Sequence, residues 1–297
     1  MNFLHELAVK GRLVEEALDR YLPPADHYPP IIHEAIRYSV FAGGKRLRPV
    51  LVLAAAEVVG GSSAAVLPAA CGLELIHTYS LIHDDLPAMD NDDFRRGKPT
   101  SHKVFGEAIA ILAGDALLTM AFELIARCTV DGLVPAARVT RAIYEISKAA
   151  GSEGLIGGQV VDITSSGRPL ASEDVLWYMH EAKTAALYRA ALRTGAILGG
   201  GDEKSIDLLG EFGRHFGVAF QITDDILDVE GEQAKLGKPI GSDVRNRKHT
   251  SVTVLGLNRA KEEARRRCKL SLEALAGFGS EADFLRAAAE FIIAREY

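Results

Sequence analysis

Apolar residues recur at helical spacing along almost the whole chain, and prolines and glycines separate the runs. Residues 3–21 show this pattern clearly, and Pro23 and Pro24 end it. The same criteria predict helices over residues 30–40, 49–59, 64–85, 106–127, 134–150, 154–162, 172–198, 203–230, 250–276 and 281–296. No segment has a convincing strand pattern, and no repeat or linker divides the chain. The sequence therefore predicts an all-α protein with a single domain over residues 1–297.

The composition is that of a globular protein with a large core. Of the 297 residues, 48% are hydrophobic and 25% are charged. The net charge of -6 gives no indication of a nucleic-acid partner. The chain has three widely spaced cysteines, Cys71, Cys128 and Cys268. Their odd number and apolar surroundings predict reduced thiols of a cytoplasmic protein, not a disulfide framework or a zinc site.

Charged residues interrupt the two longest apolar stretches. Glu74 falls within residues 64–82, and Glu107 and Asp115 fall within residues 104–122. Because a membrane-spanning helix needs about 20 predominantly apolar residues, we expect no membrane span. The first residues also lack the basic, apolar and small-residue order that is typical of a signal peptide.

The first acidic cluster, Asp84, Asp85 and Asp90, directly follows an apolar helical run. Asp84 and Asp85 would then lie at the C-terminal end of a helix, where the negative end of the helix dipole disfavours carboxylates. Pro87 ends the helix, so Asp90 is expected to return from a loop. A divalent cation such as magnesium, which takes oxygen ligands and pairs with phosphate-bearing substrates, would offset the charge. Taken alone, a solvated acidic loop explains the cluster as well.

The second acidic cluster, Asp224, Asp225 and Asp228, argues against the solvated loop. Asp224 and Asp228 are four residues apart, so they share one face of a helix. The residues around them are those of a buried helix, and a half-buried pair of like charges without a counter-ion is costly. We therefore expect both clusters to face a shared site for metal and diphosphate.

Cationic residues accompany the acidic clusters. In the basic loop, residues 43–49, two glycines precede a helix and combine free amides with Lys45 and Arg48, which suits an anion. A helix start with solvated charges explains the same residues equally well. Arg95 and Arg96 follow the first cluster on a glycine-containing loop. Since guanidinium groups bind phosphate oxygens in a bidentate manner, this pair favours a diphosphate ligand.

Two glycine-containing segments and one lysine complete the candidate chemistry. Residues 154–162 match no phosphate-binding motif, so their glycines are expected to allow close packing or a kink, with Gln159 and Asp162 as candidate pocket residues. Residues 235–243 form a polar loop after the second cluster, as a mobile lid would. Lys183 would need an anion if it faces inward and nothing if it faces solvent.

These motifs, in this order, resemble those of the trans-isoprenyl diphosphate synthase family, the short-chain head-to-tail prenyltransferases. The resemblance covers essentially the whole chain and is greatest to the bacterial members that make farnesyl diphosphate. It rests on residues 43–49, on the long first aspartate motif with four residues between Asp85 and Asp90, and on residues 95–97, 157–159, 183–184, 221–228 and 236–238. It implies a bundle of helices around a deep apolar cavity, usually in a homodimer.

The resemblance also implies a role for each site residue. Magnesium, as three ions per active site, would be bound by Asp84, Asp85, Asp90, Asp224, Asp225 and Asp228. The allylic diphosphate would be held by Arg95, Lys183, Thr184, Gln221 and Lys238. Isopentenyl diphosphate would be held by Lys45, Arg48, His77 and Arg96. The residues expected to act in catalysis are Asp84, Asp90, Arg95, Lys183, Asp224 and Lys238.

Product length is expected to depend on the helix that carries the first cluster. Tyr79 and Ser80 lie about one helical turn before Asp84 and so deeper in the predicted cavity. An aromatic residue at this place resembles the cavity floor of the farnesyl-making bacterial members, so we expect a C15 product. Tyr79 as an ordinary core residue, with its hydroxyl satisfied elsewhere, is the competing interpretation.

Three other functions compete with a farnesyl diphosphate synthase. A geranylgeranyl diphosphate synthase is the nearest, because only Tyr79 distinguishes it. A terpene cyclase or head-to-head synthase would not need the basic loop, and a non-catalytic synthase subunit would usually show an eroded aspartate cluster. The expected reaction is therefore magnesium-dependent condensation of isopentenyl diphosphate with dimethylallyl or geranyl diphosphate.

Overall fold

Helices form nearly all of the structure, a computed structural model that describes residues 2–168, 170, 172–230 and 248–294. The longer helices are α1 (Phe3–Tyr21), α2 (Pro30–Val40), α3 (Leu47–Val58), α4 (Ser63–Asp84), α6 (Glu107–Val130), α7 (Ala136–Ala150), α8 (Leu155–Ser165), α10 (Ala186–Gly199), α11 (Glu203–Glu230), α15 (Leu257–Ala274) and α16 (Asp283–Ala294). The shorter elements are β1 (Phe94–Arg95), β2 (Lys98–Pro99), α5 (Ser101–Phe105), α9 (Glu173–Met179), the π-helix η1 (His180–Ala185), α14 (Ser251–Leu255) and the 3₁₀-helix η2 (Ser280–Ala282).

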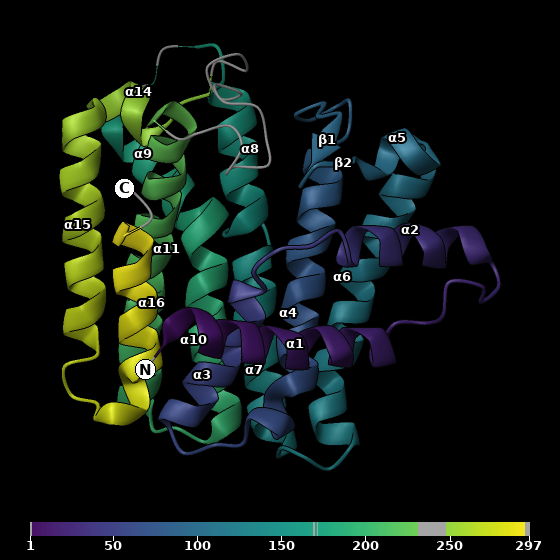
Figure 1. The fold of residues 1–297 in the computed structure, drawn as a ribbon, viewed down its shortest axis with the longest axis horizontal. Helices are drawn as coiled ribbons and strands as arrows, with labels where there is room; N and C mark the ends of the chain where they lie inside the picture. The colour runs from purple at the N-terminus through teal and green to yellow at the C-terminus, as the bar shows by residue number, and fades with distance from the viewer. Residues whose placement is uncertain (1, 169, 171, 231–247, 295–297) are drawn as a thin grey trace.

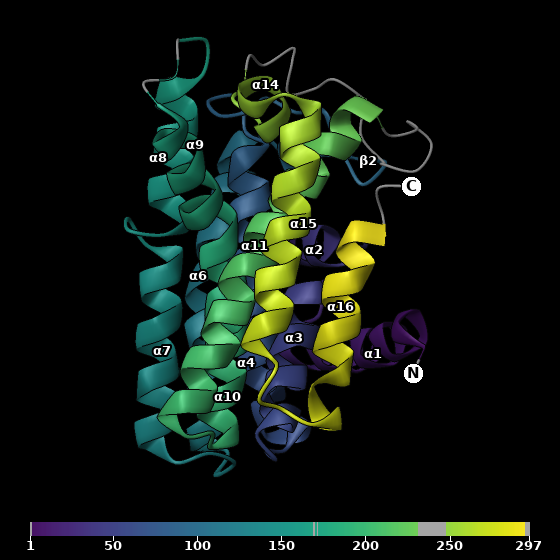
Figure 2. The same cartoon turned by 90° about the vertical axis from the view of Figure 1, so that its left-hand side faces the viewer.

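Most helices run along one common direction, while α1 and α2 cross them nearly at right angles (Figure 1). In the turned view, α11, α15 and α16 lie side by side along one face of the bundle (Figure 2), and α15 contacts both of the others. The centre consists of α3, α4 and α10, which contact one another. Nearly every residue of α10 from Leu187 to Leu198 is buried, so the core lies around this helix.

Small residues allow the central helices to approach closely. At Gly195 of α10, an added Cβ atom would lie only 2.2 Å from the carbonyl oxygen of Val52 on α3. A glycine at this crossing lets the two backbones pack directly, because any side chain would force them apart. The many alanines of α3 and α10 have the same effect at lower cost to helix formation.

The packing also places two helix ends together. The C-terminal ends of α4 and α11 lie at the same end of the bundle, next to the hairpin of β1 and β2 and to α14 (Figure 1). These are the ends that carry the two acidic clusters. The fold therefore brings together carboxylates that are about 140 residues apart in the chain.

The predicted all-α class is confirmed, and most predicted helices agree with the structure within a few residues. Three local features differ. Residues 94–99 form a short antiparallel hairpin where no strand was expected, with Phe94 paired to Pro99. The helix predicted over 172–198 contains the π-helical turn η1, and the one predicted over 250–276 breaks at Gly256, whose φ is +78°. The single domain over residues 1–297 stays a prediction.

Two helices correct the expectation about membrane-spanning length. By length and composition, both α4 and α6 are long and apolar enough to cross a membrane, despite Glu74, Glu107 and Asp115. In α4, 72% of the apolar window is buried inside the protein, as is normal for the core helix of a bundle. In α6 the buried share is 39%, so this helix leaves an apolar face uncovered. Both helices pack in the bundle described here, and their apolar length alone is weak evidence for a membrane.

Candidate active site

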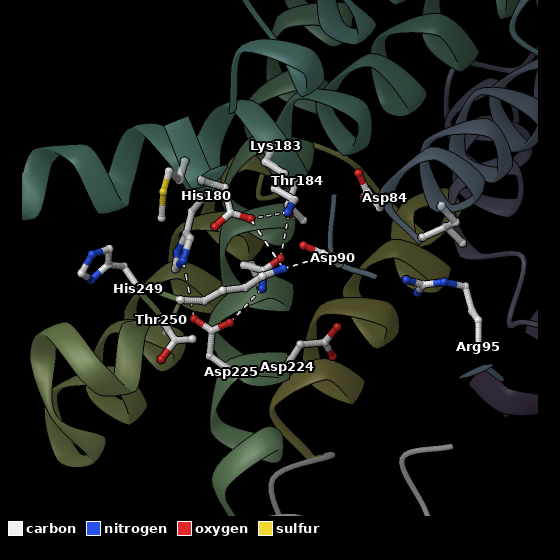
Figure 3. Close-up of a pocket in the computed structure, with 15 residues that line it drawn as sticks. Asp84, Asp90, Arg95, His180, Lys183, Thr184, Asp224, Asp225, His249 and Thr250 are labelled. Atoms are coloured by element: carbon white, nitrogen blue, oxygen red, sulfur yellow. Dashed lines mark hydrogen bonds and ion pairs between the residues drawn. The ribbon is translucent and has the colours of Figure 1, made fainter. Parts of the chain in front are cut away.

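A cavity of about 250 Å³ lies where α4 and α11 end, with residues of α8, η1 and the segment before α14 completing its wall. Asp84 and Asp90 line it from α4 and the loop that follows, while Asp224 and Asp225 line it from α11 (Figure 3). The structure thus brings the two acidic clusters to one cavity, as the shared-site interpretation requires. The individual metal-binding roles stay predictions.

The chain reverses directly after α4. Asp85 is the C-cap residue, Pro87 follows, and the backbone amide of Asp90 donates to the carbonyl oxygen of Asp84 at 2.9 Å. This turn returns Asp90 to the end of the helix, as the proline predicted. The two carboxylates therefore lie on the same wall, although they are six residues apart.

Asp84 is a carboxylate in need of positive charge. Burial raises its pKa to about 6, Asp90 adds to the rise, and Lys183 only partly opposes it. A carboxyl group with such a pKa is stabilised when a cation arrives, because the charged form then gains a partner. The donor type fits magnesium, which takes carboxylate oxygens and often bridges them to substrate phosphates.

Asp85 has a different environment from Asp84. It is 3% exposed, and Arg95 binds its carboxylate with Nε at 2.8 and 2.9 Å and with Nη2 at 2.5 Å. Burial raises the pKa of Asp85, while the bond from Arg95 opposes this. Asp85 therefore holds Arg95 at the edge of the cavity. These contacts indicate an indirect part for Asp85, since its oxygens already accept strong hydrogen bonds.

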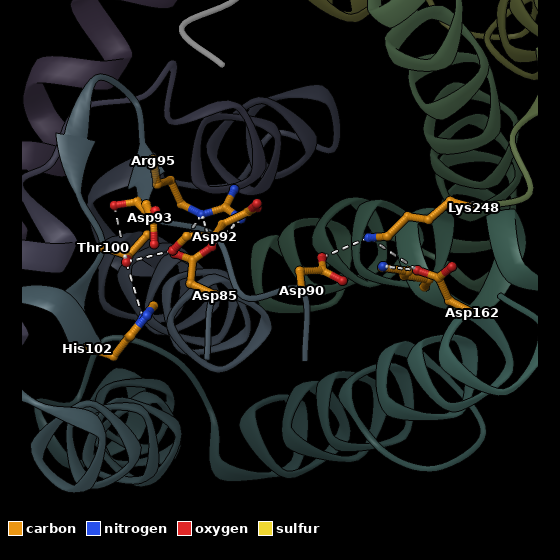
Figure 4. A network of polar contacts seen from close by, with 10 residues as sticks. Asp85, Asp90, Asp92, Asp93, Arg95, Thr100, His102, Asp162 and Lys248 are labelled. Carbon is orange, nitrogen blue, oxygen red and sulfur yellow. Dashed lines mark hydrogen bonds and ion pairs between the residues drawn. The ribbon is translucent and has the colours of Figure 1, made fainter. Parts of the chain in front are cut away.

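A chain of ion pairs crosses the cavity (Figure 4). Lys248 Nζ lies 2.8 Å from Asp90 and 3.9 Å from Asp162, and Lys183 Nζ donates to Asp162 at 2.5 Å. Burial works to raise the pKa of Asp162, but Lys183 and Lys248 overcome it and lower that pKa. Lys183 therefore faces inward and has the anion that an inward lysine needs.

Sequence reasoning missed Lys248. Lys248 precedes α14 in a basic run that has no recognisable motif. Its partner Asp90 is 158 positions earlier in the chain, so the sequence gives no sign that the two residues meet. The predicted pocket residues of α8 have different surroundings. Asp162 lines the cavity. Gln159 is 8% exposed, and its side-chain amide has no hydrogen-bond partner among the described residues. Gly158 explains the glycines of this segment, because a Cβ there would lie 2.3 Å from the backbone nitrogen of Lys183.

Asp225 joins α11 to the start of α14. One oxygen accepts from the backbone amide of Ser251 at 2.7 Å and from its hydroxyl at 2.8 Å, and the other accepts from Gln221 Nε2 at 2.8 Å. Gln221 in turn accepts from the Thr184 hydroxyl at 2.7 Å. Asp225 is 3% exposed, so these bonds give it a structural part beside its predicted metal role. Asp228, one turn along, is 2% exposed.

Three of the four residues predicted for isopentenyl diphosphate come together, whereas Lys45 is exposed, with its Nζ 5.5 Å from the ring centroid of Phe291. Arg48 Nη1 lies 3.3 Å from His77 Nε2, and its guanidinium stacks 4.4 Å from the ring centroid of Tyr188. Arg96 donates to the carbonyl oxygen of Gly43, which ties it to the basic loop. Burial, followed by the nearby Arg48, lowers the pKa of His77 well below its usual value. His77 is therefore neutral among cations, as suits a hydrogen-bonding group in an anion site.

Tyr79 and Ser80 are buried in α4. Tyr79 is 5% exposed, its ring lies edge-on to His83 with centroids 5.7 Å apart, and burial raises its pKa to about 12. Ser80 donates to the carbonyl oxygen of His77 at 2.9 Å. Among the described residues that line the cavity, Leu81 and Met179 have apolar side chains, and Tyr79 is not in the lining. The deep apolar cavity that would end at Tyr79 therefore stays a prediction.

Two further predictions concern metal and lid. Lys238 and the whole of the predicted lid, residues 235–243, lie outside the described residues. Among the described residues, no group of three or more His, Cys, Asp or Glu converges on one metal position. Carboxylates on opposite walls nevertheless suit magnesium, which is usually held by one or two carboxylates together with substrate phosphates and water.

The all-helical fold is shared with solved isoprenyl synthases. The solved apo structure of an FPP/GFPP synthase from Zymomonas mobilis matches it with a TM-score of 0.86 and 35% identity, over 98% of this chain and 99% of that one. A family model described as Polyprenyl synthetase matches residues 29–290.

Curated relatives agree with this family. The chain is 50% identical over 282 residues to the chloroplastic heterodimeric geranylgeranyl pyrophosphate synthase large subunit 1 of Arabidopsis thaliana, covering 94% of this chain and 76% of that protein. It is 49% identical over 262 residues to the farnesyl diphosphate synthase of Geobacillus stearothermophilus, covering 88% and 86%. The chain therefore belongs to the polyprenyl synthetase family and is a short-chain prenyltransferase, as its motifs indicated.

The buried histidine of η1 generates a prediction for stability against pH. His180 is 4% exposed, lies 3.5 Å from Asp225, and burial, followed by Arg267, lowers its pKa to about 4. The unfolded chain takes up this proton near pH 6.5 and the folded chain does not, so stability is lost as pH falls from about 6.5 towards 4. Asp84 acts in the opposite sense, because its raised pKa adds stability as pH falls from about 6 to 4.

We expect His180→Gln to remove the histidine part of this loss. Between pH 7 and pH 5 the variant should lose about 2 kcal/mol less unfolding free energy than the parent protein. Urea denaturation of the metal-free protein at both pH values measures the difference. His5→Gln, at an exposed position of α1, is the control and should behave as the parent does. Equal losses in parent and His180→Gln would contradict the assignment of a neutral buried imidazole.

Proposed function

We propose that the protein is a magnesium-dependent farnesyl diphosphate synthase, which condenses isopentenyl diphosphate with dimethylallyl and then geranyl diphosphate. The observation that carries this proposal is the meeting of two acidic clusters, from α4 and α11, in one cavity with Lys183, Lys248 and Arg95. In a metal-diphosphate site the carboxylates bind the metal ions, and the lysine and arginine side chains bind the diphosphate oxygens.

Magnesium would be held by Asp84 and Asp90 on one wall and by Asp224 on the other. Three ions per site remain the expectation from the family resemblance. When bound, the metal stabilises the negative charge that develops on the departing diphosphate. Asp85 and Asp225 support this arrangement indirectly, through Arg95 on one wall and through Gln221 and Ser251 on the other.

The allylic diphosphate would lie against Lys183, Lys248 and Arg95. Both lysines line the cavity and are paired to Asp162 or Asp90, so they are placed for exchange of a carboxylate partner for a phosphate oxygen. Thr184 and Gln221 add neutral hydrogen-bonding groups on the same side. Lys238 is proposed as a further contact from the family resemblance alone.

Isopentenyl diphosphate would bind to the basic loop through Lys45 and Arg48, with His77 and Arg96 opposite. Departure of the allylic diphosphate breaks a carbon–oxygen bond, and the double bond of isopentenyl diphosphate attacks the allylic carbocation. The released diphosphate then takes the proton, as in the family, so no side-chain base is needed. Leu81 and Met179 are the apolar groups that keep water from the cation at this end of the cavity.

The product is proposed to be the C15 diphosphate, with Tyr79 as the floor that limits the chain. Tyr79 is a buried ring on the helix that ends in the first acidic cluster. A geranylgeranyl diphosphate synthase is the second candidate, because the Arabidopsis relative carries that name whereas the Geobacillus relative is a farnesyl diphosphate synthase. A non-catalytic subunit has less support, since both acidic clusters are intact.

We also propose a cytoplasmic homodimer. The exposed apolar side chains Val104, Ile111 and Leu112, on α5 and α6, are 46%, 43% and 53% exposed. A second copy packing on this face would cover them, and a self-complementary patch is the usual basis of a twofold dimer. The thiols of Cys71, Cys128 and Cys268 are buried and unpaired, which suits a reducing compartment.

Removal of a predicted metal ligand should abolish most activity. With isopentenyl and dimethylallyl diphosphates and magnesium, Asp84→Asn and Asp224→Asn are each expected to lower kcat/KM by at least about a hundredfold, because each loses charge where the leaving group departs. Formation of elongated prenyl diphosphates, followed by chromatography, is the measurement. Asp26→Asn, at an exposed position between α1 and α2, is the matched control. A parent protein that forms no elongated product would reject the function itself.

Product length should respond to the size of the side chain at position 79. We expect Tyr79→Ala to move the main product from C15 to C20, because loss of the ring opens space below the growing chain. Chromatography of dephosphorylated products gives the distribution, and Tyr144→Ala, a mostly exposed tyrosine of α7, serves as control. An unchanged C15 product would remove Tyr79 from the floor, and a C20 product from the parent protein would favour the second candidate.

The proposed dimer should have twice the 32.0 kDa mass of the chain. Light scattering on protein purified from the cytosolic fraction measures this mass. Recovery of the protein in the membrane fraction would contradict the proposed cytoplasmic location. We expect Ile111→Arg to weaken the dimer, because an unpaired charge would be buried in the interface. Val130→Arg, at an exposed position at the end of the same helix, should leave the mass unchanged. A monomeric parent protein would argue against the interface.

A further inference from the structure

An ion pair lies buried beneath the basic loop. Arg46 Nη1 donates to Glu74 Oε1 at 2.7 Å, and the two side chains are 2% and 3% exposed. Burial of two charges costs several kcal/mol per ion, and apolar residues of similar volume would often stabilise a fold as well. Such a pair is poor evidence for stability alone, so its geometry is the more informative property.

All three guanidinium nitrogens of Arg46 donate hydrogen bonds, each to a different helix: α1, α2 or α4. Besides Glu74 of α4, Nη2 donates to the carbonyl oxygen of Val40 at the end of α2 at 2.6 Å, and Nε donates to Glu15 of α1 at 3.2 Å. The backbone of Arg46 is left-handed, with φ 50° and ψ 33°, at the N-cap of α3. A non-glycine residue keeps this conformation only where its surroundings hold it. The side-chain bonds of Arg46 supply that restraint.

The pair lies directly beside the proposed isopentenyl site. Arg46 stands between Lys45 and Arg48 in the basic loop, and Glu74 precedes His77 by three residues on α4. The bond from Arg46 to Glu74 therefore fixes the loop against the helix that carries His77. In this arrangement Arg48 Nη1 lies 3.3 Å from His77 Nε2.

The opposite side of the loop is held by Arg96. Arg96 donates to the carbonyl oxygen of Gly43, and a Cβ on Gly44, whose φ is +125°, would lie 2.7 Å from the Arg96 guanidinium carbon. Burial lowers the pKa of Arg96, as do Arg46, Arg95 and Arg48, while Glu74 opposes the change. Glu74 is thus the buried anion that offsets these crowded cations before a substrate arrives.

We infer that Arg46 and Glu74 are positioning residues for isopentenyl diphosphate, which fix the basic loop so that Arg48 approaches His77 and Arg96. Neither residue is assigned a contact with the substrate. The inference rests on the proposed function and goes beyond it by assigning a task to two residues outside the diphosphate ligands. The alternative is that the pair only stabilises the fold, and an experiment must distinguish this from a role in positioning.

The test is the charge-neutral double variant Arg46→Met/Glu74→Met. Because it removes one positive and one negative charge, the net charge near the substrate stays the same. We expect a folded protein in which KM for isopentenyl diphosphate rises roughly tenfold, since small displacements of binding groups are costly, while KM for dimethylallyl diphosphate changes less than about twofold. Calorimetric titration with isopentenyl diphosphate alone should show the same loss of affinity without turnover.

A second ion pair, which joins α1 to α3, provides the control. Lys10 of α1 and Glu57 of α3 lie 2.6 Å apart, far along α3 from the basic loop. The double variant Lys10→Met/Glu57→Met removes the same charges and also loosens α1 from α3. If general loosening were the cause, both double variants would raise KM for isopentenyl diphosphate. We expect the control to keep both KM values of the parent protein.

The outcomes separate the inference from the function on which it rests. Unchanged KM and affinity for isopentenyl diphosphate in a folded Arg46→Met/Glu74→Met protein would overturn the inference, as would an equal rise in both KM values. If that variant does not fold, Glu74→Asp decides. It keeps the negative charge and leaves the bonds of Arg46 to Val40 and Glu15 in place, but its shorter side chain weakens the contact with Arg46, and a selective rise in KM is required. Failure of the parent protein to elongate any substrate would instead reject the proposed function, and titration would still measure the site.

Discussion

Negative charge concentrated at one end of a helical bundle is the constraint on which this structure depends. Asp84, Asp90 and Asp224 come from two helix ends that the fold places around one cavity. Carboxylates at the C-terminal end of a helix repel one another and the helix dipole, so the protein must supply cations. Lys183 and Lys248 do so from inside the chain, and a metal-diphosphate substrate complex would do so during the reaction.

A buried polar network connects the elements of the second wall. Asp225 accepts bonds from Gln221 and from Ser251, which lies beyond the segment that follows α11. Gln221 accepts from Thr184 in the π-helical turn, and Gly158 of α8 lets that turn approach closely. Since each member is satisfied by another, loss of one leaves a buried partner unpaired. This coupling holds cavity-lining groups of η1 and α11 in one geometry with the start of α14.

Helical periodicity predicted the fold class and nearly all longer helices, because the apolar face of a helix repeats locally in sequence. It failed where the structure departs from an uninterrupted α-helix. A hairpin with two-residue strands is too short for an alternating pattern, and the π-turn at His180–Ala185 differs from an α-turn by a single hydrogen-bond step. The apolar length of α4 and α6 was also misjudged, because isolated charges such as Glu74 are paired inside the core.

The sequence by itself determined which chemical groups are present and their local spacing: two aspartate clusters on helices, a basic loop before a helix, and an arginine pair. Only the tertiary structure decided what each group does, because partners such as Asp90 and Lys248 are far apart in the chain and meet only when helices pack. Adjacent aspartates illustrate the reason. Asp84 remains short of positive charge while Asp85 is bound to Arg95, although both are the same residue type in the same motif. Burial and distance, which the sequence does not contain, set that difference.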